Sequence, residues 1–132
     1  QLSEIQALYG LNAYRRYEQR ALAQTIERHT AVVIATPGGL VSDPTAFNQL
    51  LSQCTTIWLQ ATPEDHMGRV MAQGDTRPMQ ANPEAMDDLK RILTGRTAFY
   101  SKAQFVVNTS AQSLEQTFAQ LLSVVRTQVT PL

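Results

Sequence analysis

The sequence predicts an α/β fold, a three-layer sandwich in which helices cover both faces of a parallel sheet. Three short apolar runs rich in β-branched residues have the length of buried strands, and segments with helical periodicity lie between them. Strands that alternate with helices form parallel sheets, because each helical crossover returns the chain to the same edge. The length of 132 residues suits one domain, so we expect a single domain over residues 1–132.

The first 40 residues are predicted to form two helices and a strand. Residues 2–8 read as a short helix that closes near Gly10, and a second helix runs over about 13–29. Residues 30–36 are apolar or β-branched throughout, which is typical of a buried parallel strand. Pro37, Gly38 and Gly39 end that strand.

Two proline signals begin the next helices. Asp43 precedes Pro44, an N-cap followed by proline at the first helical position, so a helix is expected to about residue 53. Thr62 and Pro63 repeat the signal, and that helix is expected to end near residue 74. The apolar run 55–61 between these helices is the second predicted strand.

The remainder is predicted as loop, helix, strand and helix. Residues 75–83 are polar with two prolines and read as a mobile loop. A helix over 84–93 is interrupted at Gly95 and continues over 96–102. Residues 104–108 form the third strand and 111–125 the closing helix. The apolar side chains of that helix expected to point inward are Leu114, Phe118, Leu121, Leu122 and Val125.

Composition excludes several classes of protein. Lys plus Arg and Asp plus Glu are both 11, so the balance argues against a broad nucleic-acid or membrane footprint. One cysteine, Cys54, allows no internal disulfide, and we expect a cytoplasmic protein. Neither histidine has a cysteine or a carboxylate at the spacing that metal ligands require, so a metal site is not expected. The chain begins at Gln1, without an initiator Met or a signal peptide, and is interpreted as cut from a longer protein.

Two groups of residues are candidates for ligand binding near the first predicted strand. In parallel sheets ligands lie past the carboxyl ends of the strands, which selects Gly38 and Gly39, where backbone can approach a ligand closely. The alternative interpretation of these two glycines is a strand-to-helix turn with no ligand. Arg15 and Arg16 point about 100° apart on a helix, so only one can face a pocket, where its fork suits a carboxylate. Solvated arginines paired with Glu18 are the alternative.

Two further arginines are candidates in the second half. Arg77 stands before Pro78 in the predicted loop and could close over a phosphate. Arg96 stands beside Gly95. The alternative interpretation is that both arginines are ordinary surface residues. The phosphate-binding fingerprint GxxxxGK[ST] does not occur in the sequence.

In this order the motifs resemble those of the shikimate kinase family, from the first residue to about Thr127. The matching segments are Tyr14-Arg15-Arg16-Tyr17-Glu18, Pro37-Gly38-Gly39, Arg77-Pro78 and Arg96 followed by Tyr100. The resemblance implies that Arg15 binds shikimate, that Gly38 and Gly39 contact its ring, that Arg96 holds its carboxylate and that Arg77 belongs to a phosphate lid.

The departures from the family are as informative. Pro37 replaces the first glycine of the Gly-rich loop, and Val70 replaces an arginine that lies under adenine. The family's first two strands, with the P-loop lysine and the Asp-x-Asp segment, have no counterpart. The resemblance therefore implies a P-loop kinase fold lacking its first two strands. We expect the 132-residue chain not to work as a kinase by itself, with ATP and Mg²⁺ as cofactors only if a longer parent is active.

A closer resemblance is to the C-terminal domains of bacterial regulators of benzoate degradation, which join a helix-turn-helix of the Xre type to a shikimate-kinase-like sensor. It is found in residues 75–79, 84–93 and 95–100. This likeness implies a benzoyl-CoA effector and DNA binding through a module outside this chain. Arg15, Gly38, Gly39 and Arg96 would line the acyl end of the effector site, and Arg77 the phosphate end. A ligand-sensing regulator domain is accordingly the main functional prediction.

Two alternatives remain open: part of an active shikimate kinase that phosphorylates shikimate with ATP, and a structural or dimerisation module. The family's strand order, 2-3-1-4-5, also has a consequence for assembly. The absent strand 1 would lie between residues 31–36 and 56–61, leaving two open edges. We expect these two strands to pair directly, or another chain to fill the place, and hence a homo-oligomer.

Overall fold

The computed structural model describes residues 2–72 and 84–128. It divides into two compact units, Gln1–Cys54 and Thr55–Leu132, which are taken in turn. The predicted loop 75–83, with Arg77, lies outside the described residues. One domain over residues 1–132 stays a prediction.

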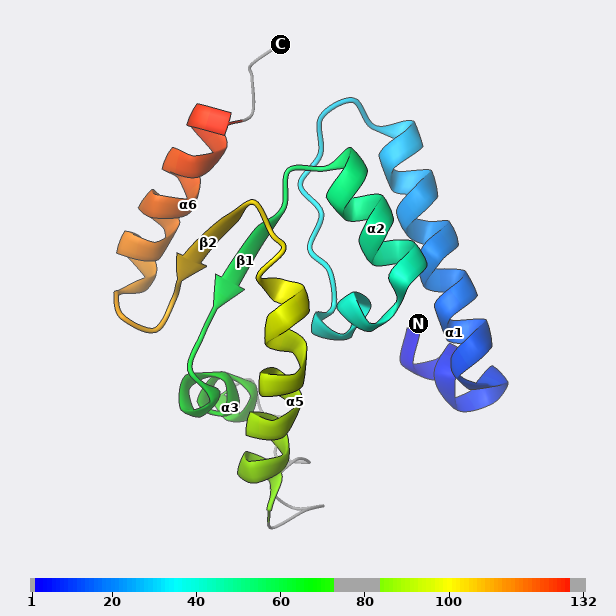
Figure 1. Ribbon diagram of the computed structural model, residues 1–132, viewed down its shortest axis with the longest axis horizontal. Helices are drawn as coiled ribbons and strands as arrows, with labels where there is room; N and C mark the ends of the chain where they lie inside the picture. The colour runs from blue at the N-terminus through cyan, green and yellow to red at the C-terminus, as the bar shows by residue number, and fades with distance from the viewer. Residues whose placement is uncertain (1, 73–83, 129–132) are drawn as a thin grey trace. The chain divides into compact units, whose positions relative to one another are not determined.

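A kinked helix, α1 (Leu2–Arg28), opens the first unit (Figure 1). Its kink lies at Gly10, where φ is 84° and ψ is 175°. Glycine reaches positive φ without the steric penalty that a Cβ brings, so it separates two helical segments here. The predicted pair of helices with a break at Gly10 is confirmed.

A short 3-10 helix, η1 (Gly38–Ser42), leads into α2 (Pro44–Gln53). Asp43 caps α2, because its side chain accepts hydrogen bonds from the backbone N–H groups of Thr45 and Ala46. Pro44 occupies the first turn, as the sequence predicts. The core of this unit consists of Leu22, Leu40, Val41, Ala46, Phe47 and Leu50.

The predicted strand over residues 30–36 is wrong. These residues form neither helix nor strand, and Val33 is 92% exposed. A strand exists only when a neighbour takes up its backbone hydrogen bonds, and an apolar sequence does not provide one. The direct pairing expected between this run and the next strand is also absent from the described residues, whose sheet contains only two strands, both from the second unit.

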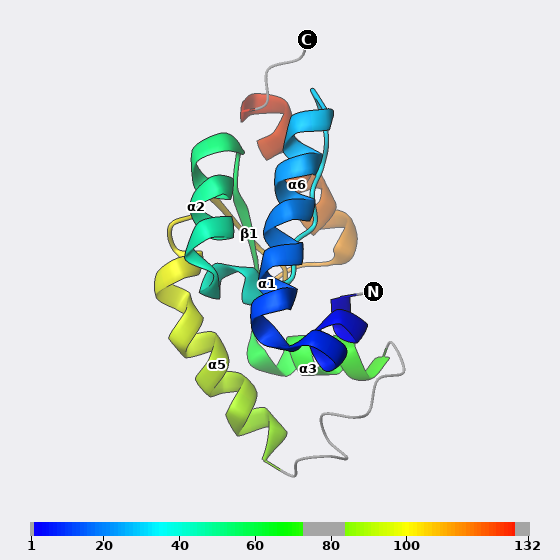
Figure 2. The same cartoon turned by 90° about the vertical axis from the view of Figure 1, so that its right-hand side faces the viewer.

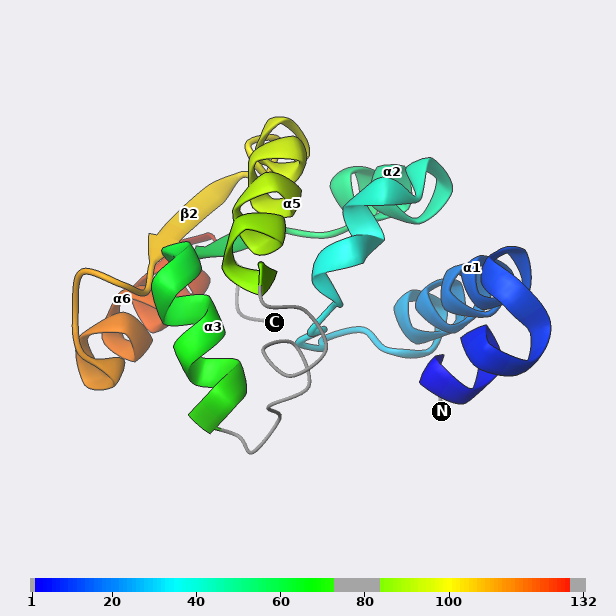
Figure 3. The same cartoon turned by 90° about the horizontal axis from the view of Figure 1, so that it is seen from below.

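The second unit is built on a two-stranded parallel sheet, β1 (Ile57–Gln60) and β2 (Phe105–Asn108). Ile57 is opposite Phe105, and Gln60 is opposite Asn108. The crossover between them contains α3 (Pro63–Ala72) and α5 (Ala85–Tyr100), and α6 (Leu114–Gln128) follows β2. In Figures 1 and 3 the strands lie between α5 and α6. The predicted α/β class with a parallel sheet is confirmed.

Polar contacts at the carboxyl end of the sheet tie the strands to α3. The Arg69 guanidinium donates to the Thr109 hydroxyl at 2.8 Å and to the Thr109 carbonyl at 3.0 Å. The Thr109 N–H in turn donates to the Gln60 carbonyl at 2.7 Å. Thr62 caps α3 as predicted, because its hydroxyl accepts from the Asp65 N–H at 3.1 Å. These contacts fix α3 against the carboxyl ends of β1 and β2.

Two expectations about the helices of this unit are wrong. Gly95 does not interrupt α5, which is continuous to Tyr100. Leu114 is 85% and Phe118 60% exposed, whereas the sequence predicts both to point inward. The apolar stripe of α6 is wider than the surface that two strands offer it, so only part of the stripe is covered. In the described ranges no helix combines the length and the apolar character that a membrane crossing requires.

Paired substitutions test whether residues 30–36 lie outside the core. Val33→Asp places a charge at a side chain that already faces solvent, so the free energy of unfolding should change by less than about 0.5 kcal/mol. Val107→Asp makes the same change at a side chain that is 0% exposed, and the loss should be about 4 kcal/mol or more. Urea unfolding followed by circular dichroism measures both, and a large loss from Val33→Asp would contradict the exposed position.

Gly95→Ala tests the continuity of α5. A Cβ at this position meets no atom within 4 Å, and alanine favours the helical conformation more than glycine does. The free energy of unfolding should therefore rise by about 0.5–1 kcal/mol. A loss of stability in the same urea measurement would show that the backbone departs from a helix at Gly95.

Candidate functional site

One face of α1 carries the polar residues that meet η1 and the start of α2. Arg15, Glu18 and Gln19 stand at positions i, i+3 and i+4, so they share one face of the helix. Leu22 continues that face into the core and is 6% exposed. The packing of Leu22 therefore directs the polar residues one and two turns earlier toward the same neighbouring segment.

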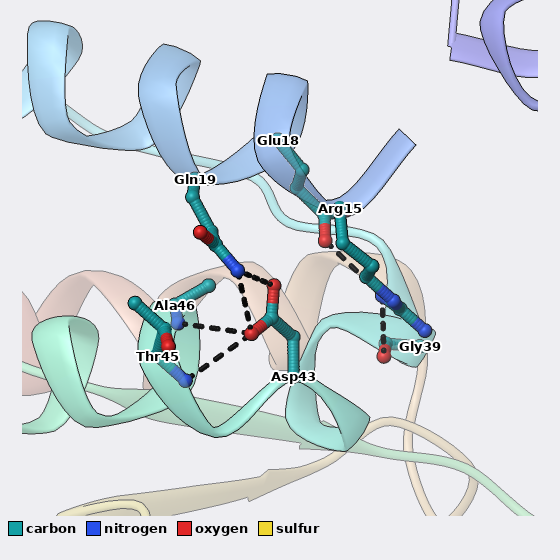
Figure 4. A network of polar contacts seen from close by, with 7 residues as sticks. All are labelled: Arg15, Glu18, Gln19, Gly39, Asp43, Thr45 and Ala46. Carbon is teal, nitrogen blue, oxygen red and sulfur yellow. Dashed lines mark hydrogen bonds and ion pairs between the residues drawn. The ribbon is translucent and has the colours of Figure 1, made fainter. Parts of the chain in front are cut away.

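Arg15 bridges its own helix and the glycine turn (Figure 4). Its Nη1 donates to Glu18 Oε1 at 3.2 Å and to the carbonyl oxygen of Gly39 at 3.3 Å. The side chain is 25% exposed. Neither Nε nor Nη2 bonds to any described residue, so two edges of the guanidinium remain available to an acceptor.

Glu18 is buried, with 5% of its surface exposed. One carboxylate oxygen accepts from Arg15, while Oε2 has no partner among the described residues. A buried carboxylate oxygen without a donor costs free energy. Glu18 Oε2 is therefore an unsatisfied buried acceptor beside the Arg15 guanidinium.

The glycine turn is a single 3-10 turn. The N–H of Leu40 donates to the carbonyl of Pro37 at 3.1 Å, three residues earlier. Gly38 is exposed and Gly39 half-buried, and Gly10 is the one described residue with positive φ, so neither turn glycine needs the left-handed region. The turn meets α1 through the Gly39 carbonyl, which accepts a hydrogen bond from Arg15 Nη1.

A second contact between α1 and the turn was not predicted from the sequence. Gln19 Nε2 donates to both carboxylate oxygens of Asp43, at 3.0 Å and 2.9 Å (Figure 4). Asp43 is 5% exposed. The sequence identified Asp43 as an N-cap only, and the sole signal for Gln19 is its position one turn after Arg15.

Arg96 lies in the second unit, on α5, one turn before Tyr100. Tyr100 contacts Trp58 of β1 with ring centroids 5.4 Å apart and a tilt of 30°, which attaches this end of α5 to the sheet. Arg96 is half-buried and has no hydrogen bond or ion pair to a described residue. Figure 2 shows α5 as one unbroken helix in this region.

The structure thus brings together Arg15 and Gly39, with Gly38 next to it in the same turn. Arg96 belongs to the other unit, and Arg77 lies outside the described residues. The ligand-binding roles of all five residues stay predictions. Burial raises the pKa of the Cys54 thiol, and we assign this residue no chemistry.

Comparison with known proteins identifies the family. A family model described as shikimate kinase matches residues 1–126. The shikimate kinase of Caldicellulosiruptor saccharolyticus is 28% identical, covering 93% of this chain and 70% of its own length. The shikimate kinase of Paramagnetospirillum magneticum is 26% identical over 92% of this chain, and that of Synechococcus sp. JA-3-3Ab 32% over 77%. This chain spans 61% and 53% of the lengths of these two relatives.

These matches overturn the main functional prediction. The sequence motifs predict a ligand-sensing domain of a transcriptional regulator, but the family model and all three relatives carry the name shikimate kinase. The benzoyl-CoA effector and the DNA-binding module, which were inferred from that reading, have no support in the comparisons. The resemblance to shikimate kinase is confirmed over nearly the whole chain, and the chain belongs to the shikimate kinase family.

Proposed function

We propose that this chain forms the shikimate-binding part of a shikimate kinase, the enzyme that phosphorylates shikimate with ATP. One observation carries the proposal: Arg15 is held by Glu18 and by the Gly39 carbonyl through Nη1, with Nε and Nη2 not bonded to any described residue. A guanidinium fixed in this way presents a ready fork to a carboxylate, and shikimate has one carboxylate.

Each predicted site residue has a distinct task in this proposal. Arg15 binds the carboxylate, and Arg96 stays a predicted ligand-binding residue of the second unit. Gly38 and Gly39 let the ring approach the backbone, because no side chain stands in the way.

The residues of this chain do not fit a magnesium–triphosphate site. The sequence contains no GxxxxGK[ST] loop, and the described residues offer no group of three His, Cys, Asp or Glu that could hold a metal ion. ATP and Mg²⁺ would therefore be held by a segment outside this sequence that carries the P-loop. Arg77 would contact the transferred phosphate from the lid.

The same proposal covers the finer fold and its setting. The chain would contribute three layers of a P-loop kinase fold whose first two strands come from that other segment, in the cytoplasm. In the described residues β1 pairs only with β2, so its other edge is open to a further strand. The exposed Val33 could likewise be covered by a strand from that segment. Homo-oligomer formation is the alternative way of covering these surfaces.

Arg15→Ala tests the carboxylate site by calorimetric titration of the 132-residue chain with shikimate. A charge-assisted hydrogen-bond pair contributes about 1.5–3 kcal/mol, so affinity should fall by roughly 10- to 150-fold. Arg16→Ala is the matched control, because Arg16 is exposed and points away from Arg15, and it should leave affinity unchanged. Equal losses from both variants, or no heat with the unmodified chain, would reject the proposal.

Phosphoryl transfer should require the missing loop. The chain alone, mixed with ATP, Mg²⁺ and shikimate, should give no phosphorylated product, because its sequence contains no phosphate-binding loop to hold the triphosphate. Fusion to a segment carrying the family's phosphate-binding loop should restore ATP-dependent phosphorylation, measured by chromatography of the product. Arg15→Ala in the fusion should abolish most of that activity, and full activity with this substitution would contradict the assignment of Arg15.

A further inference from the structure

We propose that Gln19 and Asp43 are positioning residues: their hydrogen bonds hold α1 against the glycine turn so that Arg15 stays over Gly39. This inference rests on the proposed function, because it names what places the shikimate-binding arginine. Neither residue touches the ligand in the proposal. Both act through Arg15.

The two acceptors lie on one short segment. Gly39 is the second residue of η1, and Asp43 directly follows η1, with its N–H bonded to the Leu40 carbonyl at 2.9 Å. The two donors, Arg15 and Gln19, are four residues apart on α1, about 6 Å along the helix. Two parallel contacts at this spacing prevent α1 from sliding or rotating against the turn, which one contact alone would permit.

The Asp43 carboxylate is fixed independently of α1. Its Oδ1 accepts from the N–H groups of Thr45 and Ala46, at 3.1 Å and 3.5 Å, and Ala46 is 0% exposed. The N-terminus of α2 adds a favourable partial charge. Gln19 therefore bonds to a carboxylate that is held by α2 and not by its own helix. In this way α2 fixes the position of α1.

The fold does not need Gln19 for its core. Leu22, one turn further along the same face, is buried together with the apolar residues of η1 and α2. Loss of the Gln19 contact should therefore loosen the setting of α1 without releasing the helix. The predicted consequence is a weaker Arg15 site in a folded protein.

The test combines shikimate titration with NMR of the Arg15 side chain in the 132-residue chain. Gln19→Glu keeps the shape of the side chain, removes the donor and adds charge repulsion, so affinity should fall about tenfold, within the range for residues of one network. Gln24→Glu, on the same helix and exposed, is the matched control and should change nothing. Gln19→Glu combined with Asp43→Asn should restore affinity, because the new amide donates to the new carboxylate.

A double-mutant cycle separates positioning from general destabilisation. Arg15→Lys weakens the site by itself, and adding Gln19→Glu should then cause little further loss, since both changes act on one contact. In the unmodified chain the Arg15 Nη signals should be separated, because a hydrogen-bonded guanidinium rotates slowly. In Gln19→Glu these signals should merge. An equal further loss in the Arg15→Lys background, or unchanged Arg15 signals, would overturn the inference.

The result also distinguishes the two proposals. If the unmodified 132-residue chain binds no shikimate but the Arg15 NMR signals respond to Gln19→Glu, the positioning role stands and the shikimate assignment fails. Should shikimate bind while the signals and the affinity ignore Gln19→Glu, the assignment stands and the positioning role fails. If Gln19→Glu does not fold, Gln19→Met removes the donor without adding charge and is measured in the same way.

Discussion

The contact between the Arg15 guanidinium and the Gly39 carbonyl is the interaction on which the functional account depends. It joins a helix to a turn that lies 24 residues later, and it fixes one nitrogen of a group whose Nε and Nη2 make no hydrogen bond to a described residue. A preorganised arginine loses less conformational entropy on binding than a free one does.

The two buried carboxylates of this corner, Asp43 and Glu18, differ in how fully they are hydrogen-bonded. Asp43 is saturated with donors from α2 and Gln19. Glu18 is equally buried but leaves one oxygen unpaired beside Arg15. Buried oxygens are normally satisfied, so Glu18 Oε2 is the one acceptor of this pair that the described residues leave without a donor.

Much of the fold could be predicted from local signals. The kink at Gly10 and the helix starts at Asp43 and Thr62 follow from the conformational preferences of those residues. The strand expected over 30–36 could not be judged this way, because pairing depends on a partner elsewhere in the chain. For the site, motif order placed Arg15 near Gly39, whereas the amide of Gln19 carries no charge or motif that would reveal it.

A crystal structure of the 132-residue chain with shikimate would test the central claim most directly. The account predicts that the shikimate carboxylate lies about 3 Å from Arg15 Nε or Nη2, while Nη1 keeps its contacts with Glu18 and Gly39. A carboxylate bound elsewhere, with the free edge of Arg15 in solvent, would contradict it.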